Sequence, residues 1–550
     1  MFPELAPSSH VDSFTRDHLP PASQWPAFVF SRPEAIYPEQ INAVAQWLDQ
    51  AVARGHGDRP ALIGHEQDQR FVWSYAQLLE RVVQIGHVLT HDCQLVPGQR
   101  VLLRGANTPM MAACLLAVMR AGLVAVPTMP LLRAAELRVI VDKAQIDVAL
   151  YDANLPNELE PCMARGQQAG LRLAIPFRAP QADDGLEARM AGHPRVGVPH
   201  AAGRDDVCLI AFTSGTTGKP KGTMHFQRDL LAMCDLVPRH LLAMGHDDVV
   251  CGTPPLAFTF GLGGLLAFAL HWGASSILLE KYTPESLLQT VQRYRATQIY
   301  TAPTFYRQMA ALAQGFDLTS LRQTISAGEA LPDATRRAWR EASGIEMVDG
   351  LGGTEMIHIY MGSASADARP GAIGRVVPGY EAMVVDENMQ PVAPGTVGRL
   401  AVRGPTGCKY LADPRQTEYV QQGWNLPGDS VTCDADGYFY YQARNDDMII
   451  SAGYNIAGPE VEDALLTHPD VLECAVVGLP DEARGQIVCA YVVVKPNAHA
   501  NDALAEALQQ HVKQAIAPFK YPRQVHFVAQ LPRTETGKLQ RFKLRQAATS

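Results

Sequence analysis

The sequence lacks the cysteine patterns of disulfide scaffolds and zinc sites. Its ten cysteines are dispersed, none forms a C-x-x-C pair, and none stands at metal-ligand spacing from a histidine. We therefore expect reduced thiols and no metal site built on cysteine.

Segments for export or membrane insertion are also missing. The first residues, MFPELAPSSHVDSF, contain no basic segment followed by an apolar one, so no secretory signal is predicted. The sequence has two apolar stretches. Arg120 and Pro127 interrupt the first, 107–132, and glycines and His271 interrupt the second, 261–279. They predict buried core elements rather than a membrane span, and we expect a cytoplasmic protein.

A surplus of basic residues, typical of nucleic-acid-binding proteins, is absent as well. Lysine and arginine number 47 against 56 acidic residues, a formal net charge of -9, which argues against a nucleic-acid partner. A few lysines in a cleft can still hold a small phosphorylated ligand. With 47% hydrophobic and 19% charged residues over 550 positions, the composition is that of a globular enzyme with more than one domain.

Apolar strand-like runs alternate with amphipathic helical segments before residue 300, a pattern typical of layered α/β architecture. The predicted strands are Val101–Leu103, Leu123–Val126, Val148–Tyr151, Val207–Thr213, Ser276–Leu279 and Gln298–Tyr300. The predicted helices include Ala106–Arg120, Arg133–Lys143 and Glu285–Arg295. Several connections should therefore be crossovers on a largely parallel sheet.

The pattern changes after Pro370. Short β-type runs separated by turn residues predict a small β-rich subdomain, with strands at Gly379–Asp386, Val397–Val402 and Gly437–Tyr441. From about Arg444 a strand pair precedes a compact α+β unit, with helices at Pro459–Thr467 and Asp502–Ile516 and strands at Cys474–Gly478 and Val488–Val494. We place the domain boundary near Asp446, which gives a large N-terminal domain of residues 1–445 and a smaller C-terminal domain of residues 446–550.

A phosphate-binding loop is the strongest local signal. The apolar run Val207–Phe212 leads into TSGTTGKPKG, residues 213–222. Glycines let backbone N–H groups approach a polyphosphate, hydroxyls donate hydrogen bonds, and lysines neutralise charge. A Walker-type P-loop is excluded, because Pro220 follows Lys219 and Thr213 stands where the first glycine would be. The remaining alternative is a flexible surface linker.

This string resembles a specific signature of the adenylate-forming superfamily, which includes acyl- and aryl-CoA ligases, luciferases and the adenylation domains of peptide synthetases. Further blocks follow in the family order: SAGEALP (326–332), DGLGGTE (349–355), GWNLPGD (423–429), ARNDDMIISAGYNIAGPEVE (443–462) and PRTETGKLQR (532–541). The resemblance covers most of the chain. It implies a mobile C-terminal domain and a ligase that uses ATP to activate a carboxylic acid as its acyl-adenylate, with coenzyme A as the expected acyl acceptor.

The resemblance also assigns the nucleotide site. The loop would cradle the β- and γ-phosphates through Thr213, Ser214, Gly215, Thr216, Thr217, Gly218, Lys219 and Lys221. Thr354 would hydrogen-bond the α-phosphate, and Glu355 would help to hold Mg²⁺, a cation that prefers oxygen ligands. The ribose would contact Asp429 and Arg444, and the adenine pocket would be framed by Gly328, Glu329, Asp349 and Gly350.

Three further residues belong to the two half-reactions that the resemblance implies. Lys538 would bridge the carboxylate and the α-phosphate during adenylation. Asp446 matches the hinge about which the C-terminal domain rotates, and Gly453 would then leave room for the pantetheine tunnel. An ordinary solvated acidic pair of Asp446 and Asp447 is the alternative.

The acid pocket of the superfamily is lined by segments that correspond here to Phe258, Thr259, Phe260, Ala327, Gly352, His358 and Ile359. Two aromatic rings and Ile359 favour a short, flat apolar body over a long flexible chain. The strings TEMIHIY and PGAIGRVVPGY look similar to those of benzoate-CoA and 2-aminobenzoate-CoA ligases, and the carboxyl half looks closer to the 2-aminobenzoate type. We expect an aromatic acid as substrate. His358 is either a hydrogen-bonding partner of an ortho substituent or a satisfied core histidine.

Two other functions remain open at this point. An adenylation enzyme that loads a carrier-protein thiol would use the same first step, although no carrier domain is present in this chain. A nucleotide-sensing protein without chemistry is disfavoured because Lys538, Asp429 and Glu355 are all in place. The sequence leaves a homodimer open.

Overall fold

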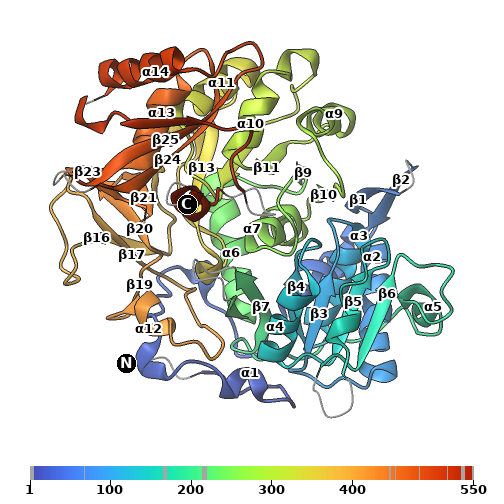
Figure 1. Ribbon diagram of the computed structural model, residues 1–550. Coiled ribbons are helices and arrows are strands. Elements are labelled where there is room, and N and C mark those ends of the chain that lie inside the picture. Colours follow the sequence, from blue (N-terminus) through green and yellow to red (C-terminus); the bar gives the residue numbers. More distant parts are fainter. Residues whose placement is uncertain are drawn as a thin grey trace.

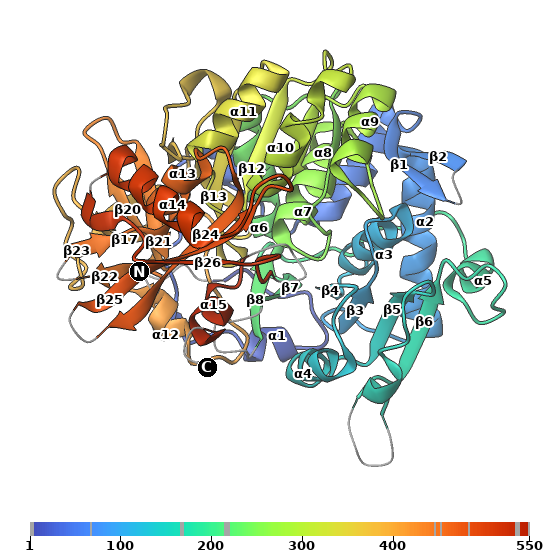
Figure 2. The same ribbon diagram turned by 45° about the horizontal axis from the view of Figure 1, so that its top comes forward.

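The computed structural model describes residues 5–66, 69–164, 170–213, 220–444, 447–451, 454–481, 484–516, 518–533 and 539–547. Within these ranges the chain forms four β-sheets with helices packed around them (Figures 1 and 2). Three sheets belong to a large N-terminal domain and the fourth to a smaller C-terminal domain, so the predicted α/β class with a C-terminal α+β unit is confirmed.

The first sheet is a mainly parallel sheet that ends at the predicted phosphate loop. In the described residues its strand order is β6-β5-β3-β4-β7-β8, with β3 (Arg100–Arg104), β4 (Val124–Thr128), β5 (Val148–Asp152), β6 (Leu173–Phe177), β7 (Val207–Thr213) and β8 (Lys221–Phe226). Only β8 runs antiparallel, against β7. Helices α3 (Pro109–Arg120) and α4 (Ala134–Ala144) are crossovers between its parallel strands, as predicted.

The beginning of α3 differs from the prediction by three residues. A helix was expected from Ala106, but α3 begins at Pro109. Thr108 caps the helix by accepting a hydrogen bond from the Met111 amide, and proline at the first helical position needs no amide partner.

The second sheet contains most of the predicted acid and adenine segments. Its order among the described residues is β15-β14-β13-β12-β11-β9-β10-β1-β2. The strands are β1 (Pro60–Glu66), β2 (Gln69–Ser74), β9 (Val249–Gly252), β10 (Ser275–Ile277), β11 (Gln298–Thr301), β12 (Gln323–Ala327), β13 (Met347–Gly352), β14 (Ile359–Gly362) and β15 (Arg375–Val376). Helices α9 (Pro284–Tyr294), α10 (Pro303–Ala310) and α11 (Asp333–Ser343) accompany its parallel strands.

The largest hydrophobic core lies between these two sheets. It is filled by α2 (Tyr75–His87), α3, α6 (Gln227–Val237) and the segment 262–270, together with side chains of both sheets. Packing on both faces explains why every residue of β3 and β4 is buried, instead of every second one.

The predicted β-rich subdomain forms the third sheet. Its strands are β16 (Glu381–Val385), β17 (Gly398–Arg403), β18 (Val420–Gln421), β19 (Trp424–Asn425), β20 (Asp429–Cys433) and β21 (Phe439–Arg444). The pairings recorded for them are antiparallel, as short runs joined by tight turns require.

The C-terminal domain has its own sheet and its own core. The sheet consists of β22 (Ile449–Ser451), β23 (Tyr454–Ile456), β24 (Val471–Asp481), β25 (Gly485–Val494) and β26 (Gln524–Phe527). Helices α13 (Gly458–Leu466) and α14 (Asp502–Ala515) pack their apolar residues against it, around Val461, Val476 and Leu508. A separate core is the mark of an independent domain. None of the helices in the described parts of the chain is long and apolar enough to cross a membrane.

Candidate active site

The predicted adenine and acid segments meet at the carboxyl ends of parallel strands. The register of β11, β12 and β13 places Thr301 beside Ser326 and Ala327 beside Gly350. Ligands of open α/β sheets bind at this edge, where the strands give way to loops. The fold therefore brings together segments that lie up to 50 residues apart in the sequence.

The phosphate loop joins two paired strands. Thr213 at the end of β7 lies opposite Lys221 at the start of β8, so the two strand ends that flank the predicted loop lie side by side. Ser214, Gly215, Thr216, Thr217, Gly218 and Lys219 lie outside the described residues, and their contacts with phosphate stay predictions.

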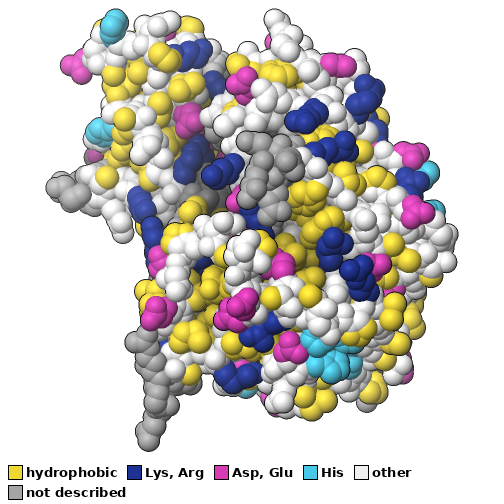
Figure 3. All heavy atoms as spheres, turned by 90° about the vertical axis from the view of Figure 1, so that its right-hand side faces the viewer, with side chains coloured by type: hydrophobic (Ala, Val, Ile, Leu, Met, Phe, Trp, Pro, Cys, Tyr) yellow, Lys and Arg dark blue, Asp and Glu magenta, His cyan; other side chains and the backbone are white. Residues whose placement is uncertain are grey.

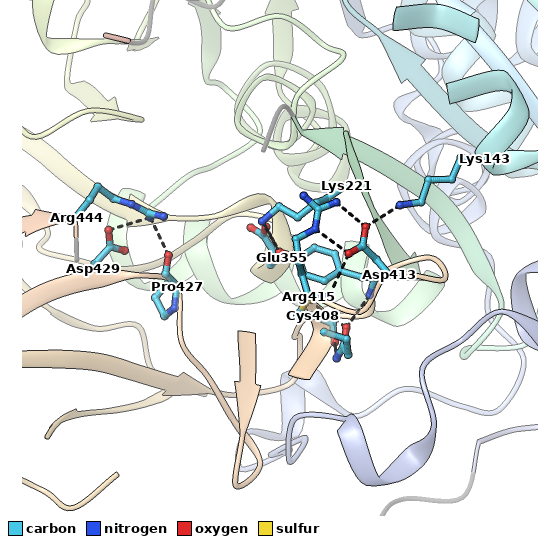
Figure 4. A network of polar contacts seen from close by, with 11 residues as sticks. Lys143, Lys221, Glu355, Cys408, Asp413, Arg415, Pro427, Asp429 and Arg444 are labelled. Atoms are coloured by element: carbon cyan, nitrogen blue, oxygen red, sulfur yellow. Dashed lines mark hydrogen bonds and ion pairs between the residues drawn. The ribbon is translucent and has the colours of Figure 1, made fainter. Parts of the chain in front are cut away.

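Lys221 and Glu355, both labelled in Figure 4, are joined by a tyrosine that the sequence analysis missed. The Tyr410 hydroxyl accepts a hydrogen bond from Lys221 Nζ at 2.9 Å and donates one to Glu355 Oε1 at 2.6 Å. Lys221 Nζ lies 3.6 Å from the same carboxylate oxygen. Burial and the Glu355 carboxylate raise the pKa of Tyr410 far above its usual range, so the phenol stays protonated as a donor. Thr354 precedes Glu355 in a short 3₁₀ turn, Thr354–Met356.

The backbone around β8 fixes Tyr410 in this position. The Met224 amide donates to the Lys409 carbonyl, and the Leu411 amide donates to the Gly222 carbonyl. Lys409 itself is fully buried and donates a hydrogen bond to Asp229 at 2.8 Å. Removing either partner of this ion pair would be strongly destabilising, because the other charge would remain buried without compensation. Nothing in the sequence around Lys409 distinguishes it from a surface lysine.

Glu355 fits the role of a magnesium ligand. Its Oε1 atom is held by Tyr410, and in the described part of the chain no hydrogen bond engages Oε2. Described His, Cys, Asp and Glu residues form no group of three that could hold a metal ion. A single carboxylate is compatible with Mg²⁺, which usually keeps several waters and binds through one or two carboxylates and substrate phosphates.

The predicted ribose site is assembled as a pair of facing residues on β20 and β21. Asp429 is buried and accepts a hydrogen bond from Arg444 Nη1 at 3.2 Å, and Arg444 also donates to the Pro427 carbonyl at 2.7 Å (Figure 4). Gly428 has φ +86°, and a Cβ there would lie 2.8 Å from the Arg444 guanidinium. Glycine is therefore required for this close approach.

The adenine segment contains two acidic groups in different surroundings. Glu329 accepts hydrogen bonds from Thr304 at 3.3 Å and from Arg533 at 3.1 Å. Burial raises the pKa of Asp349 to about 7, and Arg336, 3.8 Å away, offsets part of this increase. Gly328 has φ +91° and Gly350 lies directly beneath the Ile359 side chain, so both glycines are required by the local geometry.

The predicted acid residues form one compact cluster. The His358 ring lies 5.7 Å from Phe260 and 4.6 Å from Phe268, and its Nε2 atom lies 3.4 Å from the Phe260 carbonyl oxygen. Ile359 packs on Gly350, and a Cβ at Gly352 would lie 2.6 Å from the His358 carbonyl oxygen. Thr259 and Ala327 are buried, whereas Phe258 and Phe260 are partly exposed. Burial lowers the pKa of His358 to about 3, so the imidazole is neutral at any physiological pH.

Two more groups support this site without any sequence motif. Asn107 donates to the Pro254 carbonyl and accepts from the Leu256 amide, which holds the loop leading to Phe258. Beside Tyr410, Asp413 accepts hydrogen bonds from Lys143 at 2.8 Å and from Arg415 (Figure 4). Only the three-dimensional pairing of distant segments reveals these residues.

The C-terminal domain is docked against the adenine segment. Arg533 bonds Glu329, and the Asp333 amide donates to Asp463 Oδ1 at 3.1 Å. Arg533 also pairs with Leu539 in an antiparallel bridge, so the two residues that flank 534–538 lie together. Lys538, Asp446 and Gly453 lie outside the described residues, and their roles stay predictions.

Comparison with known proteins agrees with this arrangement. Residues 49–410 match the family model of AMP-binding enzymes, and residues 460–538 match the AMP-binding enzyme C-terminal domain. The fold and these matches define an AMP-forming acid–thiol ligase, an enzyme that uses ATP and coenzyme A. The chain belongs to the AMP-binding enzyme family, among its acyl- and aryl-CoA ligases.

Several relatives act on aromatic acids. Benzoate–CoA ligase of Thauera aromatica is 34% identical over 526 residues, which cover 94% of this chain and 98% of the relative. The crystal structure of the anthranilate CoA ligase AuaEII in complex with anthranoyl-AMP has a TM-score of 0.88 at 31% identity, covering 94% of this chain and 99% of that one. A benzoate CoA ligase from Burkholderia xenovorans LB400 has a TM-score of 0.82 at 29% identity, covering 92% and 100%.

Proposed function

We propose that the protein converts 2-aminobenzoate, with ATP and coenzyme A, to 2-aminobenzoyl-CoA, AMP and diphosphate, with benzoate as the poorer substrate. In the first step a carboxylate oxygen attacks the α-phosphorus and diphosphate leaves. In the second step the thiol of coenzyme A attacks the acyl carbonyl and AMP leaves. The sequence predicts magnesium as the metal ion and a cytoplasmic location, and it leaves a homodimer open.

His358 carries the choice of acid. Its neutral ring has one nitrogen near the Phe260 carbonyl, while Nδ1 is buried without a hydrogen-bond partner among the described residues. If Nε2 carries the proton, Nδ1 is an acceptor, and an unpaired buried acceptor costs about 1–3 kcal/mol. We infer that a small turn of the buried His358 ring on substrate binding presents Nδ1 to an ortho amino group, which supplies the missing donor. Benzoate has no such donor.

A panel of acids tests this proposal. We expect 2-aminobenzoate to have the highest kcat/KM among benzoate, hydroxybenzoates, phenylacetate and short fatty acids. His358→Leu should reduce the advantage of 2-aminobenzoate over benzoate at least about tenfold, the equivalent of one hydrogen bond. Phe268→Leu is the matched control, because it removes a ring in contact with His358 but no acceptor. A preference that survives His358→Leu, or that favours a fatty acid, would reject the assignment.

The groups around the phosphates have separable roles. Tyr410 is expected to hold Lys221 toward the phosphates and Glu355 toward Mg²⁺, and Lys538 to stabilise charge at the α-phosphate. Asp429 would hold the ribose. No covalent bond to the enzyme is required, which agrees with the fact that eight of the ten cysteines are buried.

Tyr410→Phe should lower the adenylation rate by roughly 10- to 100-fold, because it removes hydrogen bonds to two charged groups worth about 1.5–3 kcal/mol each. The loss should be partly recovered at high Mg²⁺ if Glu355 is displaced from the metal. Diphosphate release measured against Mg²⁺ concentration gives this result. Tyr419→Phe is the control. The Tyr419 ring lies 5.8 Å from the Tyr410 ring, and the Tyr419 hydroxyl has no hydrogen-bond partner in the described chain. Equal behaviour of the two variants would exclude a role for the Tyr410 hydroxyl.

Docking of the C-terminal domain should depend on pH through Asp463. Burial, reinforced by the neighbouring Asp333 carboxylate, raises the pKa of Asp463 to about 7 in the docked arrangement. Asp463 therefore binds a proton more tightly in the docked state than in a separated state, where its carboxyl has an ordinary pKa. Docking consequently weakens as pH rises from about 4 through 7.

Pulsed electron resonance distances between labels on α11 and α14 measure this equilibrium. The wild type should lose docked population between pH 5 and pH 8, and Asp463→Asn should not respond over this interval. Glu460→Gln serves as the control, because Glu460 lies on the same helix but pairs with Lys520 of its own domain. Identical pH profiles for wild type and Asp463→Asn would contradict the explanation.

A further inference from the structure

A second cavity, of about 430 Å³, lies away from the candidate active site. It is bounded by β2, α2, the start of α3 and α5 (Leu186–Ala191), on the right-hand side of the molecule in Figure 1. Figure 3 shows this side, where Arg and Lys side chains stand beside hydrophobic ones. None of Phe258, Phe260, His358 and Ile359 lines the cavity. Its volume is within the range of small-molecule sites.

Aromatic side chains form one wall of this cavity. Phe71 and Trp73 are two residues apart on β2 and therefore project from the same face of the strand. Their rings lie 5.8 Å apart at an angle of 42°, and both are only partly buried. Met110 at the start of α3 contributes apolar surface to the lining. A flat aromatic ligand matches such a lining.

A cation without an acidic partner stands over the aromatic wall. The Arg81 guanidinium lies 4.3 Å from the Trp73 ring centroid and donates to the Gln77 carbonyl at 2.8 Å. Within the described ranges it forms no ion pair, and the adjacent Glu80 is paired with Arg195 at 3.4 Å. Burial lowers the pKa of Arg81, yet the guanidinium stays charged at neutral pH. A carboxylate is the planar anion that guanidinium binds best.

Glu187, which lines the cavity, has a carboxylate oxygen that lacks a donor. Glu187 Oε1 accepts a hydrogen bond from the Arg178 amide at 2.6 Å. Its Oε2 atom is buried and has no hydrogen-bond partner among the described residues. Arg178 does not supply one, since its guanidinium binds Asp152 and Glu280. Leaving such an oxygen unpaired is costly, and a turn of the Glu187 side chain that presents it to a ligand N–H or O–H group would remove this cost.

We propose that this cavity is a second, non-reacting site for a small aromatic acid that carries an amino or hydroxyl group. The ring lies against Phe71 and Trp73, the carboxylate pairs with Arg81, and the amino or hydroxyl group donates to the Glu187 carboxylate once that side chain turns toward the cavity. The proposal goes beyond the proposed function and is independent of it, because the two sites share no residue.

Calorimetric titration of the full chain with 2-aminobenzoate, without ATP, tests the proposal. Arg81→Met and Trp73→Leu should each weaken one binding event at least tenfold, and His358→Leu should leave that event unchanged. Arg70→Met is the matched control, because Arg70 lies on the same strand but stacks over Tyr294 outside the cavity. Benzoate should bind this site more weakly than 2-aminobenzoate, and benzamide more weakly still.

A photoreactive azido derivative of 2-aminobenzoate provides a readout that needs no variant. Adducts on wild-type peptides containing Trp73 or Met110 support the second site, whereas adducts confined to the segments 258–268 and 352–359 overturn it. The absence of any binding event sensitive to Arg81→Met, in protein with an unchanged melting temperature, overturns it as well. If the chain fails to adenylate aromatic acids but the Arg81-sensitive event persists, the proposed function fails and the second site stands.

Discussion

Lys538→Ala is expected to slow formation of the acyl-adenylate by about 10²–10³ while leaving thioester formation from supplied acyl-adenylate near the wild-type rate. A preorganised cation at the point where negative charge develops contributes on this scale. The charge is required only in the first half-reaction, when the carboxylate oxygen and the α-phosphate approach each other. Once the adenylate exists, the same cation has no role in the attack of the thiol.

The contacts of the C-terminal domain support this prediction. Arg533 bonds Glu329 of the predicted adenine segment, and Leu539 pairs with Arg533, so the two described residues that flank 534–538 lie together near the candidate site. Separate single-turnover assays for the two half-reactions provide the measurement. Lys543→Ala is the control, because Lys543 is an exposed lysine of α15 (Arg541–Ala547) in the same domain. An equal loss in both half-reactions would reject the assignment of Lys538.

The elements that the sequence predicted well are those whose pattern is local. The apolar run 207–212 followed by small and hydroxyl residues predicts β7 and its loop, and β7 has the predicted bounds, Val207–Thr213. The same holds for the β-rich subdomain, where turn residues separate the strands. The predicted and observed start of α3 differ because the Thr108 cap sets where the helix begins. Capping depends on one side chain, whereas the prediction used the periodicity of apolar residues.

The sequence analysis missed the parts of the site that are created by contacts between distant segments. Tyr410 follows β8 by almost 190 residues, and it reaches Lys221 only because 409–411 pairs with β8. Burial of the Lys409–Asp229 pair and the Asn107 contacts with 254–256 arise in the same way. A single sequence carries no record of such contacts. The motifs predicted the groups that would bind nucleotide, and the fold adds the groups that hold the described ones in place.

The contacts on either side of Asp446 are consistent with the predicted hinge. Arg444 is the last residue of β21 and is held by Asp429 in the N-terminal domain. Asp447 pairs with Arg545 of α15 at 2.7 Å, and its amide donates to the Arg444 carbonyl. In the sequence, therefore, only residues 445 and 446 lie between Arg444, which is held in the third sheet, and Asp447, which also contacts the C-terminal domain. A rotation of that domain must be absorbed by φ and ψ changes in this short interval.

Asp446→Pro is therefore expected to spare adenylation and to lower coenzyme A-dependent thioester formation roughly a hundredfold or more. Proline fixes φ near −65° and removes an amide, and an incompatible backbone costs about 3 kcal/mol, with each 1.4 kcal/mol worth a factor of ten. The docked arrangement held by Arg533–Glu329 and Asp333–Asp463 would persist, and the segment with Gly453 would not reach the acyl group. Asp446→Ala is the matched control, because it removes the carboxylate but leaves φ free. The two half-reactions are followed by single-turnover assays on folded protein. Thioester formation at the wild-type rate in Asp446→Pro would show that rotation about this residue is not required. An equal loss of thioester formation in Asp446→Ala would assign the effect to the carboxylate instead.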